Sequence, residues 1–109
     1  MMQSEIFQAL KTLGLPVSYH HFEGKVHPPF LVYFRASDDN IASDFSVHGK
    51  FRTYTIELYM KKKDLVIEKR IEMLLGNLDS DYETMENYID EEKMYQVVYK
   101  IEIIEKEGY

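Results

Sequence analysis

The ten residues from Phe51 to Met60, FRTYTIELYM, decide the fold class of this sequence. One alternating set is mainly apolar and comprises Tyr54, Ile56, Leu58 and Met60; the other is mainly polar and comprises Thr53, Thr55, Glu57 and Tyr59. Successive side chains of a strand point to opposite faces, so this alternation predicts a strand with one buried face. Such a strand needs a layer of other elements to cover that face.

The segment that follows supplies a covering helix. Asp64 is placed to cap it, and the spacing of its apolar residues predicts a buried stripe of Ile67, Ile71, Leu74 and Leu78. We expect the helix to end near Gly76-Asn77 and to direct Glu68, Lys69, Arg70 and Glu72 to water. The preceding run Lys61-Lys62-Lys63 is interpreted as a solvated connection, with phosphate contact as the alternative.

The N-terminal segment predicts a first helix and two strands. Ser4 can cap a helix over residues 4–13, which Gly14 and Pro16 would stop. Residues 17–22 and 30–34 are rich in strand-forming types, with Pro28-Pro29 between them. Residues 37–49 are mostly small and polar and form the longest expected loop.

The C-terminal segment predicts a hairpin. Residues 82–89 and 94–104 are its strands, residues 90–93 its polar turn, and the inward-facing residues are Tyr95, Val97, Tyr99, Ile101 and Ile103. The expected order is α-β-β-β-α-β-β in one domain over residues 1–109, because two domains would each be too small to bury a core. The fold class is therefore α+β, a mostly antiparallel sheet with two helices packed on one face.

Composition narrows the possible functions. The chain has no cysteine, which excludes disulfides, thiol nucleophiles and cysteine-ligated metals. A net charge of -6 argues against specific nucleic-acid binding, since phosphate recognition needs clustered cations. No apolar run reaches the length of a membrane span and the first residues do not resemble a signal peptide, so we expect synthesis in a cytoplasm without export or membrane association.

No group of residues predicts catalysis or a cofactor. His20 and His21, with Glu23 and His27 nearby, are the best metal candidates, but adjacent residues of a strand point to opposite faces. Residues 38–40 and 79–81 resemble fragments of calcium loops without the required glycine and final glutamate. We therefore expect no catalytic, cofactor-binding or metal-binding residue.

The remaining signals indicate surfaces for association. In the loop at residues 37–49, the apolar Ile41, Phe45 and Val47 either tuck under the domain or dock a partner. The sheet face away from the helices is expected to carry Tyr59, Val98 and one or both of Tyr82 and Tyr88. Tyrosine is also common in strands in general, so these aromatic residues indicate either a contact surface or ordinary strand composition. The nine tyrosines and six phenylalanines of the chain are consistent with both interpretations.

Two stretches resemble a known group of phage proteins. The first is Tyr54-Thr55-Ile56-Glu57-Leu58-Tyr59 with the downstream Lys62-Lys63-Asp64 and Glu68-x-x-Ile71-Glu72-x-x-Leu75. The second is Tyr88-Ile89-x-Glu91-Glu92-x-Met94-Tyr95-Gln96-Val97. Over nearly the whole chain the sequence is similar to minor tail proteins of long-tailed phages, in particular tail terminators and tail-to-head joining proteins.

The resemblance implies a non-catalytic structural subunit. Such proteins form a ring with copies of themselves, commonly a hexamer, on the head-proximal end of the tail tube. Their partners would be the tail tube protein and the head connector proteins, and their location the host cytoplasm during assembly and then the virion tail. The loop at residues 37–49 and the hairpin at 82–104 would supply contacts, and an acidic lumen would let DNA slide.

Two other classes remain open on the residues. One is a ferredoxin-like ligand-binding or regulatory module with a pocket between sheet and helices. Ligand-dependent thermal stabilisation of a monomer would favour it. The other is a metal-dependent enzyme that uses His20, His21 and His27.

Overall fold

The structure is a computed structural model of the chain that describes residues 3–36, 45–46, 49–78 and 81–105. Its elements follow the chain in the order α1 (Gln3–Lys11), β1 (Val17–Tyr19), β2 (Phe30–Arg35), β3 (Phe45–Ser46), β4 (Gly49–Met60), α2 (Leu65–Asn77), β5 (Asp81–Ile89) and β6 (Met94–Glu105). The α+β class is confirmed, and the order matches the expected one except for the two-residue β3.

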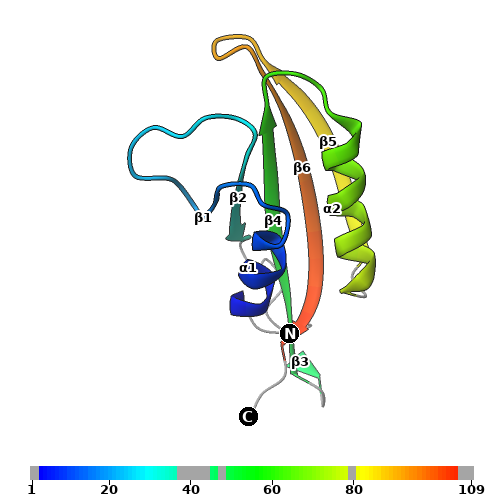
Figure 1. Ribbon diagram of the computed structural model, residues 1–109. Coiled ribbons are helices and arrows are strands. Elements are labelled where there is room, and N and C mark those ends of the chain that lie inside the picture. Colours follow the sequence, from blue (N-terminus) through cyan, green and yellow to red (C-terminus); the bar gives the residue numbers. More distant parts are fainter. Residues whose placement is uncertain (1–2, 37–44, 47–48, 79–80, 106–109) are drawn as a thin grey trace.

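The sheet is mixed and mostly antiparallel. Its strand order is β1-β2-β4-β6-β5, and β3 pairs with β4 off this path. Only β1 and β2 run parallel among these pairs, and residues 20–29 connect them as a wide loop that stands out from the sheet (Figure 1). β1 and β5 are therefore the two opposite edges of the sheet.

One face of the sheet carries the core. Ile56 lies opposite Tyr33 of β2 and Tyr99 of β6, and every second residue on these strands shares its face. The fully buried residues are Ile6, Leu10, Leu31, Tyr54, Ile56, Leu58, Met60, Ile71, Leu75, Tyr99 and Ile101. Both helices contribute to this cluster, so both cover the same face, as the sequence predicts (Figure 1).

Helix α2 begins and ends where its sequence indicates. The Asp64 side chain accepts hydrogen bonds from the backbone N–H groups of Val66 and Ile67, the expected N-cap. The predicted stripe is partly wrong: Leu75 is fully buried, whereas Leu74 and Leu78 are only partly buried. Leu75 lies four residues after Ile71, one helical turn further along the buried face.

The N-terminal elements are shorter than predicted. Helix α1 includes Ser4 rather than starting after it, and ends at Lys11; Gly14 then adopts φ 78°, a left-handed conformation that glycine accepts without strain. Strand β1 stops at Tyr19 because His20 has φ 71°, which takes the chain out of the sheet. The expected strand over residues 17–22 is therefore wrong beyond Tyr19.

The molecule is elongated, with principal extents of 45 × 26 × 26 Å. Strands β4, β5 and β6 run along its length, and the β5–β6 turn forms one end (Figure 1). No helix in the described part of the chain is long and apolar enough to cross a bilayer.

Candidate interaction surfaces

The outer edge of β5 is the longest exposed strand edge. β5 pairs with β6 over nine residues, and no other described strand pairs with it. All residues from Tyr82 to Tyr88 are exposed, including Met85 at 55% and Tyr88 at 49%. Such an edge presents unpaired backbone N–H and C=O groups that another strand can bind.

Tyr82 and Tyr88 lie on the opposite face from the one predicted. Tyr82 pairs with Ile101 and Tyr88 with Tyr95, and both partners point towards the helices. Paired residues share a sheet face, so these tyrosines project from the helix-covered side of the edge strand. The Tyr88 and Tyr95 rings contact edge to face with centroids 5.0 Å apart.

Tyr59 and Val98 do lie on the face away from the helices. Tyr59 stacks on Phe30 with ring centroids 5.0 Å apart, and Phe30 in turn contacts Phe22 edge to face at 5.4 Å. Val98 is half-buried on the same face, opposite Glu57. The wide loop thus covers part of this face with Phe22.

A row of polar side chains crosses the sheet face that points away from the helices. The Tyr59 hydroxyl donates to Glu57 Oε1 at 2.8 Å and accepts from Gln96 Nε2 at 2.9 Å, and Asn87 Nδ2 donates to Gln96 Oε1 at 3.1 Å. Burial, with the hydrogen bond to Glu57, raises the pKa of Tyr59 to about 12. The Tyr59 hydroxyl therefore makes its hydrogen bonds within the subunit, to Glu57 and Gln96.

The predicted contact loop lies mostly outside the described residues. Ile41 and Val47 are not among them. Phe45 belongs to β3, where its backbone pairs with Lys50, so part of the expected loop is a short strand.

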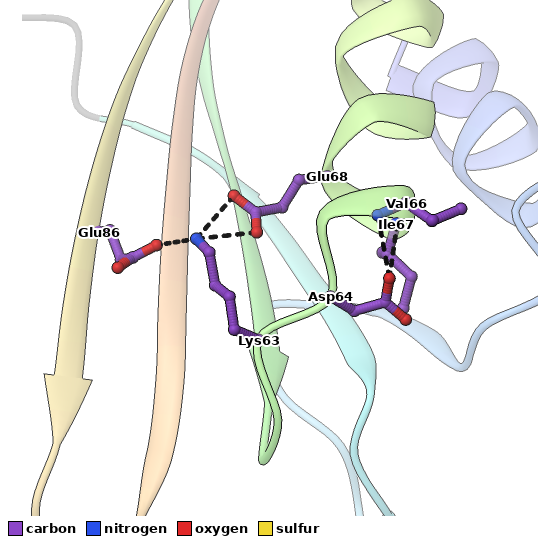
Figure 2. Close-up of polar contacts among 6 residues, drawn as sticks. All are labelled: Lys63, Asp64, Val66, Ile67, Glu68 and Glu86. Carbon is purple, nitrogen blue, oxygen red and sulfur yellow. Dashed lines mark hydrogen bonds and ion pairs between the residues drawn. The ribbon is translucent and has the colours of Figure 1, made fainter.

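The lysine run has a structural role that the sequence analysis missed. Figure 2 shows the Lys63 ammonium between two carboxylates: Nζ lies 2.8 Å from Oε2 of Glu68 in α2 and forms an ion pair with Glu86 in β5. The Glu68 side chain is only 12% exposed, so the expectation that it faces water is wrong. Lys63 ties the first turn of α2 to the edge strand.

Helix α2 also exposes apolar side chains that sequence analysis did not single out. Leu65, Val66 and Met73 are 69%, 68% and 63% exposed. Their exposure could have been predicted from the sequence, because they lie outside the buried stripe of the helix and so cannot pack into the core. These residues add apolar surface on the outer side of α2.

The histidines do not form a metal centre with other described residues. His20 and His21 are exposed, with ring centroids 6.0 Å apart. Among the residues that the structure describes, no group of three or more histidine or acidic side chains has a geometry that could hold a metal ion.

Comparison with known proteins adds no assignment. No protein-family model and no curated protein matches this chain.

Proposed function

We propose that this chain is a structural subunit of a phage or prophage tail, which assembles with copies of itself into a ring that ends the tail tube and joins it to the head. In this role the protein is non-catalytic and needs no cofactor. Its partners are itself, commonly as a hexamer, the tail tube protein and the head connector proteins. It is located in the host cytoplasm during assembly and then in the virion tail.

The exposed β5 edge is the observation that carries this proposal. A long, unprotected edge strand is an aggregation hazard that monomeric proteins usually shorten, cover or charge. Here the edge is nine residues long and carries exposed Tyr82, Met85 and Tyr88 beside the acidic Glu83 and Glu86. An edge of this kind suits a subunit whose edge becomes buried on assembly.

The position of the two edges is compatible with a closed ring. A ring of identical subunits needs two different complementary surfaces on each copy, related by a rotation that closes. β5 and β1 are opposite edges of one sheet, and they differ in length, nine residues against three. Each copy therefore carries two unlike edges, as a head-to-tail contact requires.

The alternative of a ligand-binding module finds less support. A pocket between the helices and the sheet would occupy the space in which Ile6, Leu10, Ile71 and Leu75 are fully buried against the strands. Filled cores of this kind leave little room for a ligand.

Electron microscopy of particles made with and without the gene tests the proposal. Tails of uncontrolled length, or tails and filled heads that fail to join, are expected when the gene is deleted, and supplying the gene in trans should restore joined particles. Normal particles in the deletion strain would refute the proposed function.

A further inference from the structure

A pocket opens where the wide loop meets the connection from β4 to α2. It has a volume of about 370 Å³, and its lining residues are Pro28, Pro29, Met60, Lys61, Lys62, Lys63, Asp64 and Ile67. Ligand sites in proteins usually measure about 300–1,000 Å³. The lining comes from connections and from the ends of the elements that they join, so the pocket lies beside the filled core rather than inside it.

The walls of this pocket are apolar and stiff. Pro28, Pro29 and Ile67 are half-buried there. Met60 also lines the pocket but is only 2% exposed, so the other three supply most of the accessible apolar surface. Because proline has almost no side-chain freedom to lose, covering the two prolines costs little conformational entropy. An apolar side chain of a partner therefore finds a preformed seat.

Two lysines at the pocket are free to bind an anion. Lys61 and Lys62 are exposed, and neither forms an ion pair within the part of the chain that the structure describes. Lys63 differs, because its ammonium is already paired with two carboxylates (Figure 2). Lys61 and Lys62 outweigh Asp64, which leaves positive charge at this pocket in a chain whose net charge is -6.

The backbone at the start of α2 is not available to an anion. The N–H groups of Val66 and Ile67 donate to Oδ1 of Asp64 at 3.0 and 3.4 Å, so the cap has satisfied them. The exposed lysines must therefore hold the anion. Contacts of exposed lysines are individually weak, because the ammonium is strongly hydrated and its stem is flexible. An occupant needs apolar contact in addition to charge.

The apolar surface continues beyond the pocket onto the first turn of α2. Leu65 and Val66 stand between the lining residues Asp64 and Ile67 in the sequence and are 69% and 68% exposed. A small molecule in the pocket would leave both uncovered, whereas an extended chain segment can cover them as well. Charge complementarity with the two free lysines selects carboxylates on that segment.

We propose that this pocket docks an acidic peptide segment of a partner protein. An apolar side chain of the segment lies between the two prolines and Ile67, and its carboxylates pair with Lys61 and Lys62. The contact is at the β4–α2 connection and not at the β5 edge, so it does not depend on the proposed function.

NMR titration of the isotope-labelled full chain tests the docking. The probe is the synthetic peptide Glu-Leu-Glu-Leu-Glu. One matched control, Lys-Leu-Lys-Leu-Lys, reverses its charge, and the other, Glu-Gly-Glu-Gly-Glu, removes its apolar side chains. The probe should shift the amide signals of residues 61–67 and leave those of residues 82–88 in place. Each control should need about tenfold higher concentration for the same shift, because it lacks one of the two kinds of contact.

A pair of double variants separates the two lysines from the overall charge of the chain. Lys61→Met combined with Lys62→Met should weaken binding of the probe about tenfold, because both charge contacts are lost. Lys69→Met combined with Lys100→Met removes the same charge from exposed lysines that do not line the pocket. Because distant exposed charges are screened by salt, this control should keep the affinity within about twofold of the parent chain.

The proposal is wrong if the probe shifts no amide of residues 61–67, or if the two double variants bind it equally. Inorganic phosphate that shifts these amides at the same concentration as the probe would show that a free anion suffices. Shifts of the same amides with rising protein concentration, without peptide, would make a second copy of the chain the occupant. Either of these results also overturns the proposal.

Discussion

The Lys63 ammonium lies against Glu68 in the first turn of α2, donating a hydrogen bond to Oε1 at 3.0 Å with Oε2 at 2.8 Å. The same ammonium contacts Glu86 of β5 (Figure 2). One side chain therefore links the start of α2 to β5, although the rest of the helix and a connection lie between them in the sequence. Its partners raise the pKa of Lys63, the hydrogen bond to Glu68 most of all.

Replacing Lys63 with methionine should destabilise the fold. Glu68 would keep a mostly buried carboxylate next to Glu86 without a cation, and we expect the free energy of unfolding to fall by about 1 kcal/mol. Urea denaturation measures this change. Lys62→Met removes the same charge from an exposed neighbour, and its free energy of unfolding should stay within about 0.5 kcal/mol of that of the parent chain. Equal losses in the two variants would show that the contacts of Lys63 with Glu68 and Glu86 do not stabilise the fold.

Loss of the Asp64 cap should weaken α2. In Asp64→Ala the backbone N–H of Val66, which now donates to Oδ1 at 3.0 Å, loses its partner. The expected cost is about 1 kcal/mol of unfolding free energy, whereas Asp64→Asn should retain most of the stability because its side-chain oxygen can still accept. An alanine variant as stable as the asparagine variant would show that the cap contributes little.

Two adjacent leucines of α2 should respond differently to truncation. Leu75 is fully buried, so Leu75→Ala should cost about 2–5 kcal/mol through lost burial and the cavity left behind. Leu74 is partly buried, so Leu74→Ala should cost clearly less. Thermal or urea denaturation of the two variants ranks them, and the reverse ranking would mean that α2 is rotated about its axis relative to this structure.

Alkaline pH should destabilise the fold partly through Tyr59. Its pKa is about 12 in the folded chain and about 10 in an unfolded one, so the unfolded chain loses this proton first. The stabilisation that the protonated Tyr59 hydroxyl contributes is therefore complete below about pH 10 and is lost as the pH rises towards 12. Lys63 contributes with the same sign, since its pKa is also raised.

A Tyr59→Phe variant isolates that contribution. The difference between its unfolding free energies at pH 8 and pH 11 should be smaller than the difference for the parent chain. Tyr88→Phe, which removes a hydroxyl from an exposed tyrosine, is the matched control for the loss of a hydroxyl. If Tyr59→Phe and the parent chain lose stability equally, the hydroxyl of Tyr59 is not responsible.

Local sequence signals predicted the parts of the fold that depend on local physics. The alternation from Tyr54 to Met60 identified a half-buried strand, and Asp64 marked the start of α2, because side-chain direction and capping are settled within a few residues. The parallel pairing of β1 with β2 and the Lys63 bridge to Glu86 depend on residues distant in the chain, so no local pattern revealed them.

The misplacement of Tyr82 and Tyr88 has a different origin. Ile89 and Met94 flank the predicted four-residue turn, and they are paired in the structure. Continuing that register places Tyr88 opposite Tyr95 and Tyr82 opposite Ile101, so the turn length already determined their face. The sequence contained this signal, and applying it would have placed both tyrosines correctly.

A reconstruction by electron cryo-microscopy of the head-proximal tail end in intact particles tests the proposed role most directly. We expect a closed ring of copies of this α+β fold at the junction with the head, with the β5 edge of each copy buried against its neighbour. A junction without this chain, or a ring in which residues 82–88 of β5 remain exposed to solvent, would contradict the account.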